Sequence, residues 1–147
     1  MIIVTLLGYD FNINFLAMSY SKGKSVFKLN TSLQLGDFVD LLLEPISKKR
    51  HIYLTRLGLH EALVNAVKHG NKLDPSKIIK VRRYITPNWL IWQIQDQGKG
   101  LNINKRKFAL PNKLESVNGR GLFIIHECFD DVRWSPKGNR VQLALKR

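Results

Sequence analysis

The stretch Glu61-Ala-Leu-Val-Asn65-Ala-Val-Lys-His69-Gly70-Asn71 decides the fold of this 147-residue chain. It closes a longer segment, residues 51–68, whose apolar side chains recur at the spacing of an α-helix. Glu61, Asn65 and His69 stand four residues apart, so a helix places all three on one stripe. We therefore expect one helix that presents a carboxylate, a carboxamide and an imidazole to a common site.

The same helix needs an apolar stripe on its other side in order to pack against a core. Gly70-Asn71 is expected to end the helix, because glycine readily adopts the left-handed turn that closes many helices. The apolar stripe is predicted to consist of Leu54, Leu57, Leu63, Val64 and Val67.

The side chains of Glu61 and Asn65 suit phosphoryl chemistry. Magnesium prefers hard oxygen ligands and often takes only one or two from the protein, so the amide oxygen of Asn65 can serve as a ligand. Glu61, one helical turn away, can accept the proton of an attacking hydroxyl group. A solvated polar face that ends in a glycine cap explains the same segment equally well.

A glycine-containing turn, Asp96-Gln-Gly98-Lys-Gly100, follows directly after a predicted strand over residues 89–95. Glycines allow a ligand to approach the backbone closely. A carboxylate at the end of a strand can accept a hydrogen bond from an exocyclic amine, such as that of adenine. An ordinary Asp-Gly turn is the alternative interpretation.

A second such turn, Asn118-Gly119-Arg120-Gly121-Leu122, opens a helix predicted over residues 121–129. The free N–H groups and the positive dipole end of a helix start favour phosphate, and Arg120 adds charge there. A plain helix cap is the alternative. The intervening loop, residues 98–118, can fold over a triphosphate as a lid. Its basic residues are Lys99, Lys105, Arg106, Lys107 and Lys113.

The pattern of the whole chain predicts a two-layer α+β sandwich, with a mixed, largely antiparallel sheet and helices on one face. Turn signals at Pro87-Asn88 and Gly138-Asn139 indicate antiparallel neighbours. Thr31 and Ser32 are candidate caps for a helix over residues 33–44. Strands are expected over residues 25–30, 77–86, 89–95, 132–134 and 140–145.

The composition is strongly basic, with 24 Lys and Arg against 11 Asp and Glu and a formal net charge of +13. This balance favours anionic partners, although a basic surface that only keeps the protein soluble is the simpler alternative.

Cys128 is the only cysteine, which excludes an intrachain disulfide and fits a reducing compartment. Neither a zinc-ligand cluster nor a P-loop motif occurs in the sequence.

The three quoted segments resemble the ATP-binding fold shared by gyrase, the Hsp90 chaperone, histidine kinases and MutL. The first segment is similar to its N box, Asp96–Gly100 to its first glycine box and Gly119–Leu122 to its second. Within that superfamily the chain is most similar to bacterial anti-sigma-factor serine/threonine kinases. The likeness rests on the first segment and on residues 119–132, and it covers roughly residues 26–147.

The resemblance implies ATP and Mg²⁺ as cofactors of a cytoplasmic serine kinase that regulates transcription. Such a kinase phosphorylates a small anti-anti-sigma protein, binds a sigma factor and is often a homodimer. Carried over residue by residue, Glu61 is the general base, Asn65 the magnesium ligand and Asp96 the acceptor for the adenine amine. The other nucleotide-binding positions implied are His69, Gly98, Gly100, Gly119, Arg120, Gly121 and Leu122.

The chain departs from this pattern just before the second glycine box. Some relatives carry a phosphate-binding arginine there, whereas this chain has Ser116 and Val117, so Arg120 or Lys113 would have to substitute. An ATP-gated binding regulator without kinase turnover is therefore the alternative function.

A nucleic-acid-binding domain is a third hypothesis, suggested by charge alone. The sequence lacks an RNA-recognition signature and a recognition-helix pattern, so nucleic acid is not an expected partner, and neither is a membrane. Residues 1–24 are assigned to an N-terminal extension, either a strand or the product of a start codon placed too early. Residues 25–147 are assigned to the ATPase domain.

Overall fold

The computed structural model describes residues 2–6, 9–13, 15–47, 49–101 and 120–147. Within these ranges, residues 2–18, 20, 49 and 50 are described by their backbone alone.

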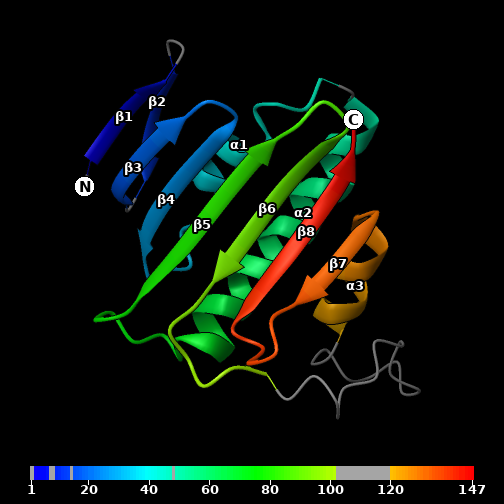
Figure 1. Cartoon of the computed structure of the whole chain (residues 1–147). Helices are drawn as coiled ribbons and strands as arrows, with labels where there is room; N and C mark the ends of the chain where they lie inside the picture. Colours follow the sequence, from blue (N-terminus) through cyan, green and yellow to red (C-terminus); the bar gives the residue numbers. More distant parts are fainter. Residues whose placement is uncertain (1, 7–8, 14, 48, 102–119) are drawn as a thin grey trace.

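A six-stranded sheet forms one layer of the molecule, with the strand order β3-β4-β5-β6-β8-β7 (Figure 1). Every described pairing in it is antiparallel, so the predicted two-layer sandwich is confirmed, with no parallel pair among the described strands. A separate hairpin pairs β1 (Ile2–Leu6) with β2 (Tyr9–Ile13). The six strands are β3 (Phe15–Ser21), β4 (Lys24–Asn30), β5 (Ile78–Ile85), β6 (Trp89–Gln95), β7 (Asp131–Trp134) and β8 (Arg140–Lys146).

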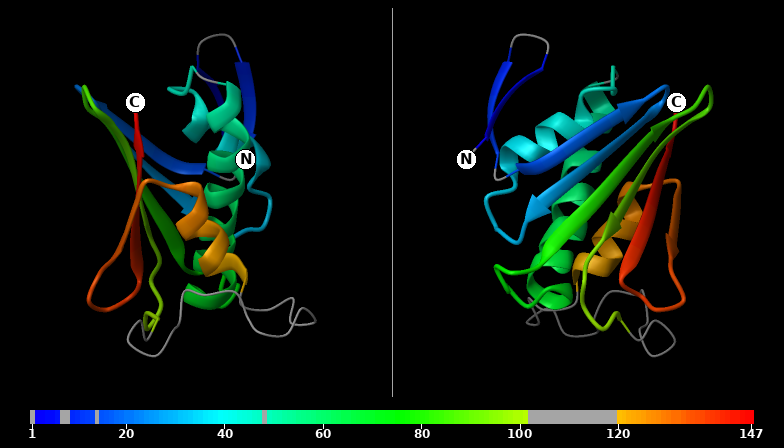
Figure 2. Two further views of the ribbon diagram at one scale, coloured as in Figure 1. Left: turned by 90° about the vertical axis from the view of Figure 1, so that its right-hand side faces the viewer. Right: turned by 60° about the vertical axis from the view of Figure 1, so that its left-hand side comes forward.

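The helices form the second layer and cover one face of the sheet (Figure 2). They are α1 (Gly36–Leu43), α2 (Lys49–Asn65) and α3 (Arg120–Cys128), and α2 continues into one π-helical turn, η1 (Ala66–Gly70). The predicted division at residues 24 and 25 stays a prediction, although β3 belongs to the same sheet as β4.

The core lies between these two layers. Side chains alternate along β6, where Leu90, Trp92 and Ile94 are buried and their neighbours are partly exposed, as expected for a half-buried strand. The indole of Trp92 donates a hydrogen bond of 3.2 Å to the carbonyl of Leu42 and meets the ring of Phe129 edge-on. These contacts join α1, α3 and the centre of the sheet.

The structure confirms part of the apolar stripe predicted for α2, since Leu63 and Val67 are buried and Val64 is partly buried. Leu54 and Leu57 were assigned to the apolar stripe of α2, but their side chains are 54% and 44% exposed. The buried side chains of this helix and its π-helical turn are Thr55, Leu59, Ala62, Leu63, Ala66 and Val67. Ala62 and Ala66 therefore belong to the buried side of the helix, and Leu54 and Leu57 do not.

The predicted caps of α1 are also wrong. The helix begins at Gly36 after Leu35, and no side chain caps it. Thr31 instead donates a hydrogen bond of 2.8 Å to the carbonyl of Lys77, and the Ser32 hydroxyl accepts one from the amide of Gln34. The two hydroxyls serve the loop between β4 and α1.

Gly58 lies where α3 packs on α2. A Cβ atom at this position would come within 2.5 Å of Phe129 Cε2 and 2.7 Å of Cys128 Cβ. We expect Gly58→Ala to lower the free energy of unfolding by about 1–3 kcal/mol, because the crossing helices must move apart. Chemical denaturation measures the change. Gly36→Ala is the matched control, since nothing lies within 4 Å of its added Cβ, and an equal loss in both variants would contradict the packing argument.

Candidate active site

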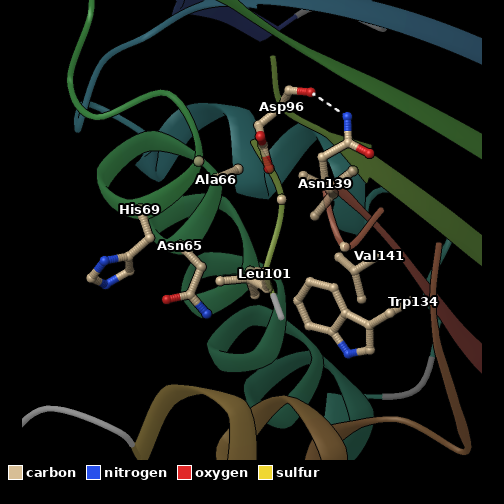
Figure 3. Close-up of a pocket in the computed structure, with 13 residues that line it drawn as sticks. Asn65, Ala66, His69, Asp96, Leu101, Trp134, Asn139 and Val141 are labelled. Atoms are coloured by element: carbon tan, nitrogen blue, oxygen red, sulfur yellow. Dashed lines mark hydrogen bonds between the residues drawn. The ribbon is translucent and has the colours of Figure 1, made fainter. Parts of the chain in front are cut away.

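Asn65 and His69 of the helix, and Asp96 after β6, line the same cavity (Figure 3). Its volume is ≈ 20 Å³, which is room for about one water molecule. A purine therefore enters only if the walls of the cavity move apart. The described lining residues are Ala62, Asn65, Ala66, His69, Gly70, Ile94, Asp96, Gly100, Leu101, Trp134, Gly138, Asn139 and Val141.

Asp96 is held at the top of this cavity by its own backbone. Its amide donates to the carbonyl of Asn139 over 3.0 Å, and its carbonyl accepts from the side-chain amide of Asn139 over 3.2 Å. Its carboxylate oxygen Oδ1 accepts a hydrogen bond of 2.7 Å from the amide of Gly98. Burial raises the pKa of the Asp96 carboxyl above its usual range, and the bond from Gly98 opposes that shift only in part.

Asn71 fixes the chain immediately after Asp96. Its buried side-chain amide donates to Thr31 Oγ1 over 2.9 Å and to the carbonyl of Ile78 over 3.0 Å. Its amide oxygen accepts from the backbone N–H of Gln97 over 2.8 Å. This fully buried carboxamide therefore joins the end of η1 to the ends of three strands, a role that sequence analysis did not assign to it.

The conformational role predicted for Gly70 is wrong. The left-handed step lies two residues later, where Lys72 and Leu73 have φ values of 56° and 58°. Gly70 is needed for a different reason, because a Cβ atom there would overlap the carboxyl group of Asp96. The glycine thus lets the carboxylate lie directly against the end of the helix.

Gly98 makes a similar close approach. A Cβ atom on this residue would overlap the carbonyl oxygen of Gly70 and lie 2.9 Å from Asp96 Oδ1. We expect Gly98→Ala to lower the free energy of unfolding by about 1–3 kcal/mol, because the obstacle is rigid backbone. The substitution should also remove any rise in melting temperature on adding Mg-ATP. Thermal melts with and without the nucleotide measure both effects, and an unchanged nucleotide-dependent rise would contradict this role.

Glu61 and Asn65 meet the start of α3. A Cβ atom on Gly121 would lie 2.9 Å from Glu61 Oε2 and 3.6 Å from Asn65 Nδ2. Glu61 is not among the described residues that line the cavity, but it stands one turn from Asn65 on the same stripe of the helix. The structure therefore brings together two segments about 60 positions apart, as the sequence predicted.

The turn between β7 and β8 completes the wall of the cavity. A Cβ atom on Gly100 would overlap the carbonyl of Lys137, and one on Gly138 would overlap that of Leu101. Both glycines have positive φ values, 87° and 75°, which suit glycine alone. The backbone N–H of Leu101 donates a hydrogen bond of 3.0 Å to the carbonyl of Gly138. This bond connects the turn between β7 and β8 to the chain that follows the first glycine turn.

Sequence analysis missed the residues that this turn supplies. Asn139 holds Asp96, and Trp134 and Val141 line the cavity opposite the helix (Figure 3). The Gly138-Asn139 pair was the available signal, but it was interpreted only as a hairpin turn.

The remaining predicted site residues fall into two groups. Lys113 and Gly119 lie outside the described residues, together with most of the predicted lid. Arg120 is the first residue of α3 and is partly exposed, whereas Leu122 is buried in the hydrophobic core and is not among the described lining residues. His69 lines the cavity and is exposed.

The donors at the site fit magnesium bound mainly by phosphate and water. The described residues contain no group of three or more His, Cys, Asp or Glu side chains able to hold a metal ion by themselves. Asn65 provides an amide oxygen beside the helix start, which matches an ion that takes only one protein ligand.

Comparison with known proteins agrees with this geometry. None of the helices in the described part of the chain is long and apolar enough to cross a membrane. A search among curated proteins found no match for the chain. A family model described as a histidine kinase-like ATPase domain matches residues 47–145, which include α2, both glycine turns and all but the final residue of the last strand. The chain therefore belongs to the histidine kinase-like ATPase domain family.

Proposed function

We propose that this protein is an ATP-dependent serine kinase that acts as an anti-sigma factor and phosphorylates an anti-anti-sigma partner. The observation that carries the proposal is the meeting of Glu61 and Asn65 at Gly121, the second residue of α3. A carboxylate able to take a proton and an amide oxygen able to hold a metal ion then stand beside a helix start, where phosphate binds well.

Each group in the site has one task in this proposal. Asp96 accepts a hydrogen bond from the exocyclic amine of adenine and so selects the base. Asn65 holds Mg²⁺, which when bound neutralises charge on the phosphate groups. The N–H groups at the start of α3 and the side chain of Arg120 stabilise the phosphates.

Glu61 carries the proton transfer. The serine hydroxyl of the partner attacks the terminal phosphorus of ATP, and a new oxygen–phosphorus bond forms while the bond to the oxygen of ADP breaks. Glu61 takes the hydroxyl proton during this step. The products are phosphoserine on the partner and ADP.

An ATP-gated regulator without kinase turnover is the second candidate. It is favoured by the positions before Gly119, where Ser116 and Val117 replace the arginine that some relatives use to bind phosphate. In that case the site holds ATP and the protein holds its partner, but no phosphoryl group is transferred. In the first proposal, the protein is a cytoplasmic homodimer that binds a sigma factor.

Phosphotransfer to a purified partner separates the two candidates. The protein is incubated with γ-labelled ATP, Mg²⁺ and a small anti-anti-sigma protein encoded beside its gene. The partner with its acceptor serine replaced by alanine is the control. Label on serine supports the kinase. A melting temperature raised by Mg-ATP without label supports the regulator, because a ligand that binds only the folded state raises stability. The absence of both effects contradicts both candidates.

A further inference from the structure

The face of the sheet that the helices leave bare is basic. The three described helices lie on one side, and no described element covers the other side (Figure 2). Burial alternates along β4, β5 and β6, so every second residue points away from the core, and the register with β6 places alternate residues of β8 on the same face. The cationic side chains on this open face are Lys24, Lys28, Lys80, Arg82, Arg133, Arg140 and Lys146.

Acidic side chains do not balance this charge. On the described strands of the open face the only carboxylate is Asp131, which pairs with Arg133 over 2.8 Å. Arg133 is also the only one of the seven cations that forms an ion pair within the described part of the chain. Asp130, which precedes β7 and lines a hollow on this face, adds a second carboxylate, so the face has an excess of five positive charges.

The register of the strands sets these cations in a row. Lys28 on β4 is directly opposite Lys80 on β5, and Lys80 is opposite Gln95, which in turn is opposite Arg140 on β8. Adjacent strands are about 4.8 Å apart, so the two lysines repel each other across the sheet. Such a pair costs stability, and an anion lying along the row would offset that cost.

Aromatic rings lie on the same face. The ammonium group of Lys146 is 5.7 Å from the centre of the Trp89 ring, and that of Lys24 is 5.6 Å from the centre of the Tyr84 ring. Trp89 also borders a hollow of ≈ 440 Å³, whose other lining residues are Ile91, Asp130, Asp131, Arg133, Gln142, Ala144 and Lys146.

We propose that this open face binds single-stranded nucleic acid. The phosphates follow the row of Lys28, Lys80 and Arg140, and a base enters the hollow and stacks on Trp89. Sheets that combine cations with exposed aromatic rings bind single strands in this way, because every base has a flat face for stacking. The amide and carboxylate groups of Gln142 and Asp131 can then meet the polar edge of the base.

Other occupants fit this surface less well. A second copy of the chain would present the same excess of positive charge and be repelled. A DNA duplex is read by an element that enters a groove, and the described strands present none. An acidic protein would match the charge, and competition with an acidic peptide is therefore one outcome of the test below.

Binding of fluorescein-labelled 12-residue oligouridylate and oligothymidylate, followed by fluorescence anisotropy without ATP, tests the proposal. We expect Lys28→Gln with Lys80→Gln to weaken binding and to reduce the slope of log affinity against log salt by about 1.4, or 0.7 for each lost phosphate contact. Lys68→Gln with Lys72→Gln removes the same charge from exposed positions at the end of the helix, and should leave the slope unchanged.

Trp89→Ala tests stacking separately from charge. We expect it to weaken binding roughly 5- to 150-fold, which corresponds to the loss of one stacked base, whereas Trp89→Phe should keep most of the affinity. Circular dichroism of both variants confirms that they are folded.

Three results would overturn the proposal. They are no binding in 0.1 M salt, an equal loss in both double variants, and an affinity unaffected by Trp89→Ala. If an oligoglutamate peptide displaces all of the oligonucleotide, and if Trp89→Ala leaves the affinity for the peptide unchanged, the surface binds acidic protein instead. Because these measurements contain no ATP and no phosphorylated partner, their failure leaves the kinase proposal untouched.

Discussion

Replacing Glu61 with glutamine is expected to lower the rate of phosphotransfer about 100- to 10,000-fold, which is the usual contribution of a positioned general base. Glutamine keeps the length and polarity of the side chain but cannot take a proton. Its contact with Gly121 at the start of α3 should therefore persist. The measurement is the initial rate of phosphoserine formation at saturating Mg-ATP, together with the affinity for the nucleotide, which we expect to stay within a few-fold of the wild type.

Glu127→Gln is the matched control for Glu61→Gln. Glu127 lies on α3 and is exposed, so the substitution removes the same charge without entering the site. A full rate in the Glu61 variant would remove its role as a base. Equal losses in both variants would point to the overall charge of the protein instead of proton transfer.

Asp96→Asn is expected to weaken ATP binding and stabilise the empty protein at the same time. The hydrogen bond to the adenine amine loses its charge, which corresponds to roughly a 10- to 100-fold loss of affinity. The free protein gains stability, because the cost of burying a carboxylate disappears; that cost raises the pKa of Asp96. Isothermal titration measures the first effect and thermal melts measure the second. Lower stability together with full ATP affinity would contradict both arguments.

The same carboxyl group predicts a pH dependence of stability. The pKa of Asp96 is higher in the folded protein than its ordinary value of 3.8. Between these two pKa values the folded state binds more protons than the unfolded state. The free energy of unfolding should therefore fall as pH rises through this window and stay lower above it. This fall should vanish in Asp96→Asn when the two pH profiles are compared.

Asp74→Asn provides a control of opposite sign. Hydrogen bonds from the hydroxyl and the amide of Ser76 lower the pKa of Asp74. The unfolded state then binds more protons, so this group adds stability as pH rises. Removing Asp74 should delete a rise with pH, whereas removing Asp96 should delete a fall. The same change of slope in both variants would contradict the assignment for Asp96.

The sequence by itself determined the local part of this site. Glu61 and Asn65 share one helical stripe because 3.6 residues make one turn, and no distant contact is needed to establish that. His69 follows them in the π-helical turn η1, which the spacing alone did not predict. The alternation along β5 and β6 similarly separates buried from outward residues without knowledge of the neighbouring strands.

Only the tertiary structure decided how these local pieces meet. Which face of α2 is buried, and hence the exposure of Leu54 and Leu57, depends on where the helix packs. The lack of room for a Cβ atom on Gly70 depends in the same way on where β6 ends and places Asp96.

The basic surface of the sheet likewise arises from pairing between distant strands. Lys28 and Lys80 are 52 positions apart in the sequence and become direct neighbours only through the register of β4 and β5. Periodicity along the chain says which way a side chain points, but only the packing of distant segments says what it meets.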